Sequence, residues 1–428
     1  MIENAGLMHA TPSPTLFSPL TLPNGQIVPN RLAKAAMEEN MAGPGQVPDQ
    51  RLFQLYQTWA QGGVGLILTG NVMVDPRAMT GPGGVVLQQG SDLAPFKRWA
   101  QAARSGGAQV WMQINHPGRQ VMAAMGQPGW APSEVALDLG KHSHLIAKPQ
   151  AMTEADIAHT MARFADTARL ACEAGFTGVQ VHAAHGYLLS QFLSPLTNRR
   201  TDRWGGTLEN RARFLLAVVQ AVRAAVPADF CVAVKLNSAD FQRGGFDEKD
   251  AQRVVHMLGG LGVDLVELSG GSYEAPAMQG ESRDGRSLAR EAYFLTFAQE
   301  IAQTARMPIM TTGGIGRLEV AQTVLGHGVA MVGMATALAM NPALPLAWRE
   351  GRALDAPRPV NKLKNKVLAA LATMALIKRQ LHRLGAGQQP QPGQSAVLSL
   401  LLDQLRTKRL TRRYRRWLLA LAPSHGAH

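Results

Sequence analysis

Eight short apolar segments, each separated from the next by a longer helical pattern, constrain the fold of this chain more than any other feature of its sequence. Aliphatic and β-branched residues dominate these segments, and most of them end near Gly, Asn, Ser or Thr, as buried strands do. Strands that alternate with helices build parallel β/α units, so eight units within residues 32–333 predict a closed (β/α)8 TIM barrel. The segments are Leu32–Met37, Val64–Thr69, Gln109–Ile114, Gly178–Val181, Cys231–Leu236, Leu265–Leu268, Pro308–Thr311 and Ala330–Gly333.

An open, doubly wound sheet is the alternative fold, but no Gly-x-Gly-x-x-Gly motif follows the first apolar segment. Thr153 and Asp156 form a capping-box pattern at the start of one expected helix. The segment from Leu16 to Pro29 fits a hairpin that turns at Asn24-Gly25 and closes the bottom of the barrel. Helices are expected at Gln50–Gln61, Asp92–Arg104, Glu154–Glu173, Leu208–Val226, Asp247–Leu261, Ala292–Ala305 and Arg317–Leu325.

Positive charge is concentrated at the end of the chain. Fifteen of the 43 Lys and Arg residues, but only two of the 30 Asp and Glu residues, lie between Gly351 and His428, so this segment carries the whole formal net charge of +13. The asymmetry predicts a barrel at residues 16–348 and a basic helical extension at residues 349–428. A Gly/Gln/Pro linker, Gly385–Gly393, separates two expected helices, the second at about Ala396–Leu421. The first helix is predicted by apolar residues at intervals of three and four: Leu363, Val367, Leu371, Met374, Ile377 and Leu381.

Of three interpretations of the basic extension, two stay open at this point. It packs on the barrel or on a second copy in a homo-oligomer, or it lies on an anionic membrane surface with Trp417 and Leu418 buried, as a peripheral contact. Nucleic-acid binding is not expected, because no nucleic-acid-binding motif accompanies the charge. The two cysteines, Cys172 and Cys231, exclude a disulfide framework and a four-cysteine zinc site. We recognise no signal peptide and no membrane-spanning segment in the sequence. Together with the two cysteines, this favours a cytoplasmic location.

The richest chemistry lies directly after the apolar segment Gly178–Val181. His182, His185 and Tyr187 leave one strand end together and can all point into the barrel mouth. Imidazoles donate hydrogen bonds to a carbonyl oxygen and stabilise the enolate-like charge that develops there, while a phenol supplies a proton nearby. A His-x-x-His metal site is the alternative, but no third ligand is evident at a suitable spacing, so no metal is expected.

This block resembles the Old Yellow Enzyme family of FMN-dependent NAD(P)H:flavin oxidoreductases and ene-reductases. The resemblance covers roughly Leu16 to Pro345, and its most specific motifs are His182-Ala-Ala-His-Gly-Tyr-Leu-Leu-Ser-Gln-Phe-Leu-Ser-Pro195, Asn198-Arg-Arg-Thr-Asp202 and Gly205-Gly-Thr-Leu-Glu-Asn-Arg211. It implies FMN and NAD(P)H as cofactors and a small α,β-unsaturated carbonyl compound as substrate. It also implies that His182 and His185 hold the carbonyl oxygen and that Tyr187 protonates the α-carbon.

The resemblance assigns further residues to the flavin. Gln113 would bond the pyrimidine edge, and Lys235 would stand where the family usually carries an Arg near N1 and C2=O. The remaining contacts would come from Ala35, Ala36, Met37, Glu38, Asn71, Gly313, Gly314, Ala335 and Thr336.

Two positions depart from the family pattern. Thr336 stands where an Arg usually pairs with the phosphate, and this predicts weaker FMN binding. Glu38 stands where Thr, Ser or Cys is common. A carboxylate there would have to be protonated, paired with a cation, or moved away by a one-residue shift of register.

Three alternative functions stay open from the sequence. A dienoyl-CoA reductase-like specificity is one, although the Cys cluster of such enzymes is absent. A flavin-free lyase that forms a Schiff base on Lys235 is another. The third is a degenerate barrel that docks to a membrane or a partner through its basic extension.

Overall fold

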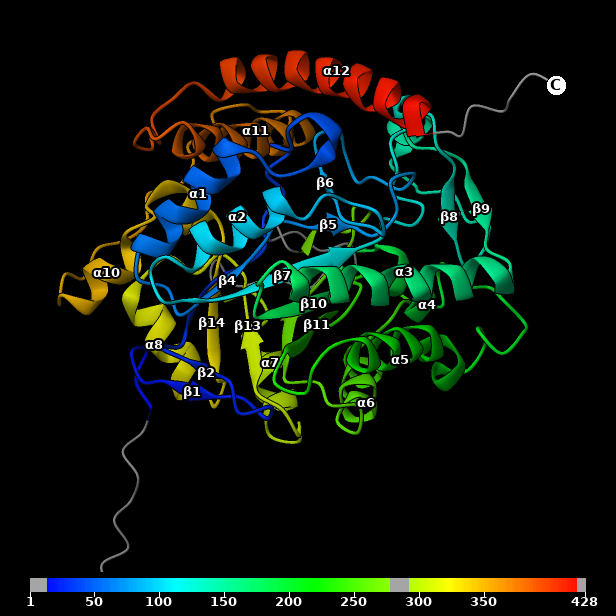
Figure 1. Cartoon of the computed structure of the whole chain (residues 1–428), viewed down its shortest axis with the longest axis horizontal. Coiled ribbons are helices and arrows are strands. Elements are labelled where there is room, and N and C mark those ends of the chain that lie inside the picture. The colour runs from blue at the N-terminus through cyan, green and yellow to red at the C-terminus, as the bar shows by residue number, and fades with distance from the viewer. Residues whose placement is uncertain (1–13, 278–291, 422–428) are drawn as a thin grey trace, which may run out of the picture.

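The computed structural model describes residues 14–277 and 292–421, and its centre is a closed barrel of eight parallel strands (Figure 1). Each strand pairs with its neighbours in parallel, and pairing of the last strand with the first closes the cylinder, as predicted. The barrel strands are β3 (Leu32–Lys34), β4 (Leu66–Leu68), β7 (Gln109–Asn115), β10 (Gly178–Ala183), β11 (Cys231–Asn237), β12 (Leu265–Ser269), β13 (Ile309–Thr311) and β14 (Met331–Met334). Short strands β5 (Val72–Met73) and β6 (Val85–Val86) extend the sheet beside β7.

The first strand is shorter than its pattern predicts. β3 ends at Lys34, and the last bond to the barrel wall is donated by the Ala35 N–H to the Met334 carbonyl, at 2.9 Å. The chain then leaves the sheet, so Ala36, Met37 and Glu38 lie in the loop at the barrel mouth. The apolar character of Ala36 and Met37 therefore predicted a strand where these residues form a loop.

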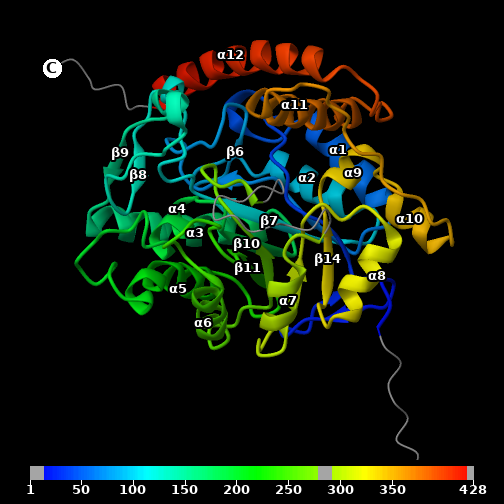
Figure 2. The same cartoon turned by 180° about the vertical axis from the view of Figure 1, so that it is seen from behind.

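Helices surround the barrel and agree closely with their sequence patterns (Figures 1 and 2). Both reciprocal bonds of the Thr153–Asp156 capping box are present at the start of α3. The expected helix Ala292–Ala305 is shorter at both ends, and Ala292 itself has a positive φ of 52°, which excludes it from the helix. The helices are α1 (Gln50–Gln61), α2 (Ala94–Arg104), α3 (Glu154–Glu173), α5 (Leu208–Ala225), α6 (Glu248–Leu258), α7 (Leu295–Ala302) and α8 (Leu318–Gly326).

Shorter elements complete the connections. They are the helices α4 (Leu188–Leu193), α9 (Thr336–Met340) and α10 (Leu344–Arg349), the strands β8 (Gly129–Ala131) and β9 (Pro149–Ala151), and the 3-10 turns at Pro44–Gln46, Ala123–Met125 and Gly140–Leu145.

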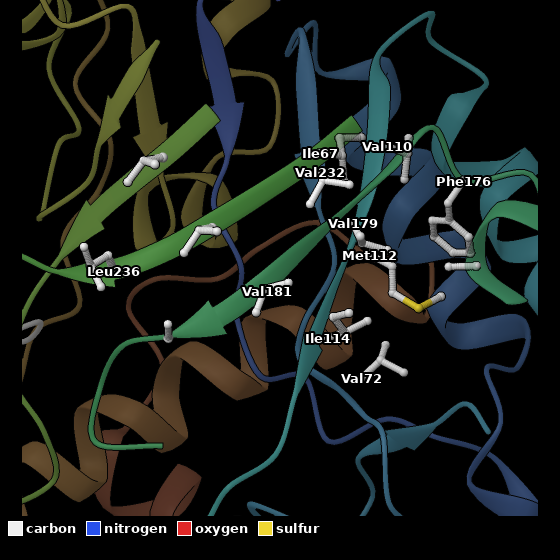
Figure 3. Close-up of a cluster of buried hydrophobic side chains, with 14 of the residues drawn as sticks. Ile67, Val72, Val110, Met112, Ile114, Phe176, Val179, Val181, Val232 and Leu236 are labelled. Carbon is white, nitrogen blue, oxygen red and sulfur yellow. The ribbon is translucent and has the colours of Figure 1, made fainter. Parts of the chain in front are cut away.

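Two apolar layers stabilise the barrel. Alternate strand residues point outward and pack against the helices, as Val110, Met112 and Val179 do in Figure 3. The residues between them point inward and fill the bottom of the barrel, which the hairpin of β1 (Leu20–Thr21) and β2 (Ile27–Val28) closes as predicted. The apolar filling stops halfway up the barrel, so the upper half is left to polar side chains.

The basic extension forms the two predicted helices, α11 (Lys366–Gly385) and α12 (Ala396–Leu421). α11 packs on α1, and α12 lies over α11 and over loops that leave β3 and β4 (Figures 1 and 2). The extension therefore packs on the barrel of its own chain, as the first interpretation predicts. The division of the chain near residue 348 stays a prediction.

Side chains of α12 bond directly to the loops at the barrel mouth. Arg406 and Arg413 donate to the Asn40 and Ala42 carbonyls at 3.1 and 2.6 Å, and the Tyr414 hydroxyl donates to the Pro76 carbonyl at 2.7 Å.

The alternative in which Trp417 and Leu418 enter a membrane does not agree with the structure, because both side chains pack against a cluster that contains Met73, Val121 and Met125. None of the helices in the described ranges is both long enough and apolar enough to span a bilayer.

Candidate active site at the barrel mouth

A chain of hydrogen bonds crosses the upper half of the barrel interior. Gln113 on β7 donates to Gln180 on β10 at 2.7 Å, and Gln180 donates to Glu267 on β12 at 2.8 Å. Glu267 in turn accepts a hydrogen bond from the Lys235 ammonium on β11 at 2.7 Å. All four side chains are buried, so the charge of Lys235 is compensated inside the protein.

Two members of this chain of hydrogen bonds, Gln180 and Glu267, were missed by reasoning from the sequence. Each is the single polar residue of a short apolar run, Gly178–Val181 or Leu265–Leu268, which is a signal that the sequence does contain. The alternation of strand residues puts Gln180 on the same face as His182, and the strand register sets Glu267 beside Lys235. A polar residue at an inward-facing position of a barrel strand is the feature that would have identified both.

His182 and His185 lie side by side above the hydrogen-bonded side chains of Gln113, Gln180, Glu267 and Lys235. Their ring centroids are 5.1 Å apart. The Nδ1 atom of His182 accepts the Ala184 N–H at 3.2 Å, so the proton of this neutral ring is on Nε2. Burial lowers the pKa of both imidazoles well below the ordinary value, and the positive charge of Lys235 lowers the pKa of each further. Both rings are therefore neutral at pH 7 and act as N–H donors rather than as cations.

The backbone at His185 is held in an uncommon conformation with a φ of +61°. Its N–H donates to Asn237 Oδ1 at 3.0 Å, and its ring Nε2 lies 2.7 Å from Ser269 Oγ. Asn237 and Ser269 end β11 and β12, so two barrel strands fix the orientation of this ring.

Tyr187 completes the predicted catalytic group. Its ring centroid lies 4.8 Å from that of His182, and its hydroxyl is 3.1 Å from the hydroxyl of Tyr273. Burial raises the pKa of Tyr187 well above the ordinary value, and Tyr273 and Glu38 raise it further, while a hydrogen bond with Asn71 acts in the opposite direction. The phenol is therefore protonated at neutral pH and keeps a proton to donate.

Tyr273 is the third functional candidate that the sequence did not reveal, after Gln180 and Glu267. It follows β12 in a Gly-Gly-Ser-Tyr segment, 86 residues after Tyr187. Burial raises the pKa of Tyr273 well above the ordinary value for a phenol, and the charge of Glu38 raises it further. No local pattern relates the two phenols, because only the order of strands around the barrel brings their loops together.

The loop after β7 holds both sides of this group in place. Gln120 donates to the His185 carbonyl at 3.0 Å and accepts the Tyr273 N–H at 3.4 Å. Arg119 forms a buried ion pair with Glu274 at 2.6 Å. The loop therefore fixes His185 and Tyr273 relative to each other.

Glu38 and its neighbour Glu39 have different environments. Glu38 accepts hydrogen bonds from Thr80 Oγ1 at 2.6 Å and Asn40 Nδ2 at 3.0 Å, and it forms no ion pair with any residue in the described ranges. Glu39 is buried and bonded to the Tyr56 hydroxyl, with the Lys34 ammonium 4.0 Å away. Neutral donors thus hold the Glu38 side chain at the mouth, and the buried cation is beside Glu39 instead.

Residues expected to bind the flavin lie around the same mouth. Gly313 and Gly314 have φ values of +121° and +72°, and a Cβ atom on either would collide with Tyr293, so only a bare backbone fits there. Ala335 directly precedes α9, which begins with Thr336. Asn115 follows Gln113 by two positions on the same strand face, and no residue in the described ranges bonds its buried amide atoms. These groups fit a ligand with a polar planar ring and a phosphate. The ring would face the amides of Gln113 and Asn115, and the phosphate would face the backbone of Gly313 and Gly314.

The histidine pair is not part of a recognisable metal site. Within residues 14–277 and 292–421 no group of three His, Cys, Asp or Glu side chains is placed to hold a metal ion. The neighbours of His182 and His185 are instead the Ala184 amide, Asn237 and the Ser269 hydroxyl.

Sequence and structure both relate this chain to known flavin enzymes. Residues 15–355 match the NADH:flavin oxidoreductase / NADH oxidase family. The chain belongs to this family. A relative from Hypocrea jecorina, the NADH-dependent flavin oxidoreductase iliE, is 40% identical, and the match covers 76% of this chain and 87% of the relative. A Neonectria relative of the same name is also 40% identical, but the match covers 76% of this chain and only 46% of that longer protein.

Among solved structures, the Old Yellow Enzyme homologue from Zymomonas mobilis is 25% identical, with a TM-score of 0.69 over 80% of this chain and 95% of its own. Membership of the NADH:flavin oxidoreductase / NADH oxidase family makes the protein an oxidoreductase with FMN and NAD(P)H as cofactors, as the resemblance implied. The predicted fold, a (β/α)8 barrel like that of the Zymomonas protein, is confirmed.

Proposed function

We propose that the protein reduces the activated C=C bond of α,β-unsaturated carbonyl compounds at the expense of NAD(P)H. FMN, when bound, would take a hydride from the nicotinamide and pass it to the β-carbon of the substrate. The observation that carries the proposal is the convergence of His182, His185 and Tyr187, two neutral N–H donors and a protonated phenol, at one point of the barrel mouth.

Each of these residues has a defined task in the proposed reaction. The Nε2–H of His182 donates to the carbonyl oxygen of the substrate, and His185 polarises the same oxygen, so charge that develops there is stabilised. Tyr187 supplies a proton to the α-carbon, and Tyr273, at 3.1 Å, is placed to share its proton with Tyr187 afterwards.

We propose that FMN is held by Gln113 and Lys235 inside the barrel and by Asn71 and the Ala35–Glu38 loop on one side. The phosphate would lie against backbone N–H groups of Gly313, Gly314, Ala335 and Thr336. Because Glu267 compensates the charge of Lys235, the barrel interior offers a reduced flavin a neutral ion pair rather than a free cation. This pairing also disfavours a lyase mechanism, which needs an unprotonated, unpaired lysine.

One experiment tests the proposed function. The purified protein is expected to be yellow, and to oxidise NADH or NADPH faster when cyclohexenone is added under anaerobic conditions. Colourless protein that fails to bind added FMN would refute the flavin assignment. Yellow protein that never consumes NAD(P)H with any enone in a panel would refute the ene-reductase activity alone.

Tyr187→Phe is expected to lower kcat for cyclohexenone reduction about 100-fold, because it removes the proton donor but leaves the ring packing. The rate of flavin reduction by NADH should be unchanged in stopped-flow measurements, since no proton is delivered to a carbon in that half-reaction. Tyr273→Phe is the matched control and should have a smaller effect. Equal rates for Tyr187→Phe and the unaltered protein would exclude Tyr187 as the donor.

The acid limb of the kcat/KM profile for the enone is expected well below pH 6.5, the ordinary histidine value. Burial lowers the pKa values of His182 and His185, so the reactive neutral form persists as the pH falls through that value. Initial rates from pH 5 to pH 8 check this, with flavin content measured at each pH. An activity loss with a midpoint near pH 6.5 would contradict neutral donors in the free enzyme.

Thr336→Arg is expected to tighten FMN binding about 10-fold, because it restores a charge-assisted bond to the phosphate. Fluorescence titration of apo-protein with FMN measures the change. Thr336→Gln has similar length without charge and should bind FMN as the unaltered protein does. An unchanged dissociation constant in Thr336→Arg would show that the phosphate does not lie at this position.

We propose residues 16–348 as the catalytic barrel and residues 349–428 as an extension that supports it. Both cysteines, Cys172 and Cys231, are free thiols, which supports a reducing, cytoplasmic location. A homo-oligomer stays a proposal.

A further inference from the structure

The face of α12 that points away from the barrel carries aliphatic side chains along its first half and basic side chains along its second half. Its first three turns expose a row of large aliphatic residues, with Leu401 58% and Leu405 65% exposed. The row consists of Val397, Leu398, Leu401, Leu402 and Leu405. Clustered aliphatic residues on a surface mark a site of association, unlike single exposed ones. We call these residues, together with the basic residues Lys408, Arg409, Arg412, Arg415 and Arg416, the outward face of α12.

Basic residues continue this face toward the end of the helix. Lys408, Arg409, Arg412, Arg415 and Arg416 are exposed, and none forms an ion pair with a residue in the described ranges. Arg406 and Arg413 point the other way and donate to carbonyls of the barrel loops. The helix therefore divides its cations between internal bonds and an uncompensated surface.

The neighbouring helix enlarges the apolar part of this surface. α11 packs on α12 through a cluster that includes Ala372, Leu376 and Ala396, and it leaves Leu368 and Leu371 exposed. Figures 1 and 2 show both helices together along one edge of the molecule, with α12 outermost.

We propose that the outward face of α12, with the exposed residues of α11, docks on an anionic membrane surface. Aliphatic side chains would enter the boundary between head groups and acyl chains, and the arginines would pair with lipid phosphates. This orientation is opposite to one that buries Trp417 and Leu418 in lipid, since those side chains pack on the barrel.

Charge favours a lipid surface over a second copy of the chain. Two outward faces packed in parallel would bring arginines against arginines, and packed antiparallel they would set the arginines of one copy against the leucines of the other. Neither arrangement pairs the whole face favourably, whereas an anionic bilayer is complementary to both of its parts.

Vesicle sedimentation of the full-length protein tests the proposal. Protein is mixed with phosphatidylcholine vesicles, with or without 30 mol% phosphatidylserine, at low and high salt. We expect pelleting with the anionic vesicles at low salt and less pelleting at high salt, because each basic residue near the surface strengthens binding about five-fold. Failure to pellet with anionic vesicles at low salt would overturn the proposal.

Two double variants identify the surface. Arg409→Gln/Arg412→Gln is expected to weaken vesicle binding at least 10-fold, and Leu401→Ser/Leu405→Ser should weaken binding at both salt concentrations. Lys97→Gln/Lys249→Gln removes two exposed charges from α2 and α6 and should bind as the unaltered protein does. Circular dichroism and cyclohexenone reduction should be unchanged in all three, so this proposal can fail independently of the proposed function.

Two results would contradict the assignment of this surface. One is vesicle binding that neither double variant weakens. The other is a dimer in sedimentation velocity that Leu401→Ser/Leu405→Ser dissociates, because the face would then be covered by a second copy.

Discussion

His182→Ala is expected to lower kcat/KM for cyclohexenone reduction by about 100- to 1,000-fold, the loss typical of removing one donor from an oxyanion site. In the proposed reaction the neutral Nε2–H of His182 donates to the substrate oxygen, and a donor held in place by the protein needs no reorganisation during the reaction. The measurement is the oxidative half-reaction, in which pre-reduced enzyme is mixed with the enone in a stopped-flow instrument.

His185 gives the matched comparison, because its backbone has a positive φ of 61°. Asn adopts this conformation readily and Ala does not, so His185→Asn removes the imidazole with little backbone strain. We expect His185→Asn to lose enone activity while retaining the thermal stability of the unaltered protein, and His185→Ala to lose both. Full enone activity in His182→Ala and His185→Asn would show that the carbonyl oxygen is bound elsewhere.

Lys235→Met is expected to lower the free energy of unfolding by about 3–5 kcal/mol. Glu267 is fully buried, and within residues 14–277 and 292–421 its carboxylate would then keep only the hydrogen bond from Gln180. Urea denaturation of the FMN-free protein measures the effect, so that loss of contacts to the cofactor does not contribute.

The double variant Lys235→Met/Glu267→Gln separates the charge effect from packing. Removing both charges leaves no unpaired buried ion, so the double variant should recover most of the stability that Lys235→Met loses. If the single and double variants were equally unstable, the loss would come from the volume of the side chain and not from the isolated carboxylate.

The barrel itself could be predicted from the sequence because its signal is local. A strand such as Cys231–Asn237 alternates residues between two environments, and helices such as Gln50–Gln61 and Glu154–Glu173 repeat apolar residues at helical spacing. The early end of β3 could not be predicted in this way. Ala35, Ala36 and Met37 have strand-like composition, but the chain must leave the sheet there to form the barrel mouth.

The local sequence pattern alone predicted only the part of the candidate site that is contiguous in sequence, whereas Gln113 and Lys235 were assigned through the family resemblance. His182, His185 and Tyr187 lie within six residues, and the strand register then adds Lys235 beside His182. Tyr273 and Glu267 belong to another β/α unit, and their distance from the histidines depends on barrel closure rather than on any local pattern. The same reason explains why the packing of α12 on the loops of β3 and β4 could not be derived from its amphipathic pattern.

The bonds from α12 to Asn40, Ala42 and Pro76 link residues separated by 338 to 371 positions. During synthesis the loops of the first two β/α units emerge from the ribosome long before the helix that fixes them. One side of the barrel mouth therefore gains these bonds only after translation has passed Tyr414, and a nascent chain without α12 leaves those carbonyls to water.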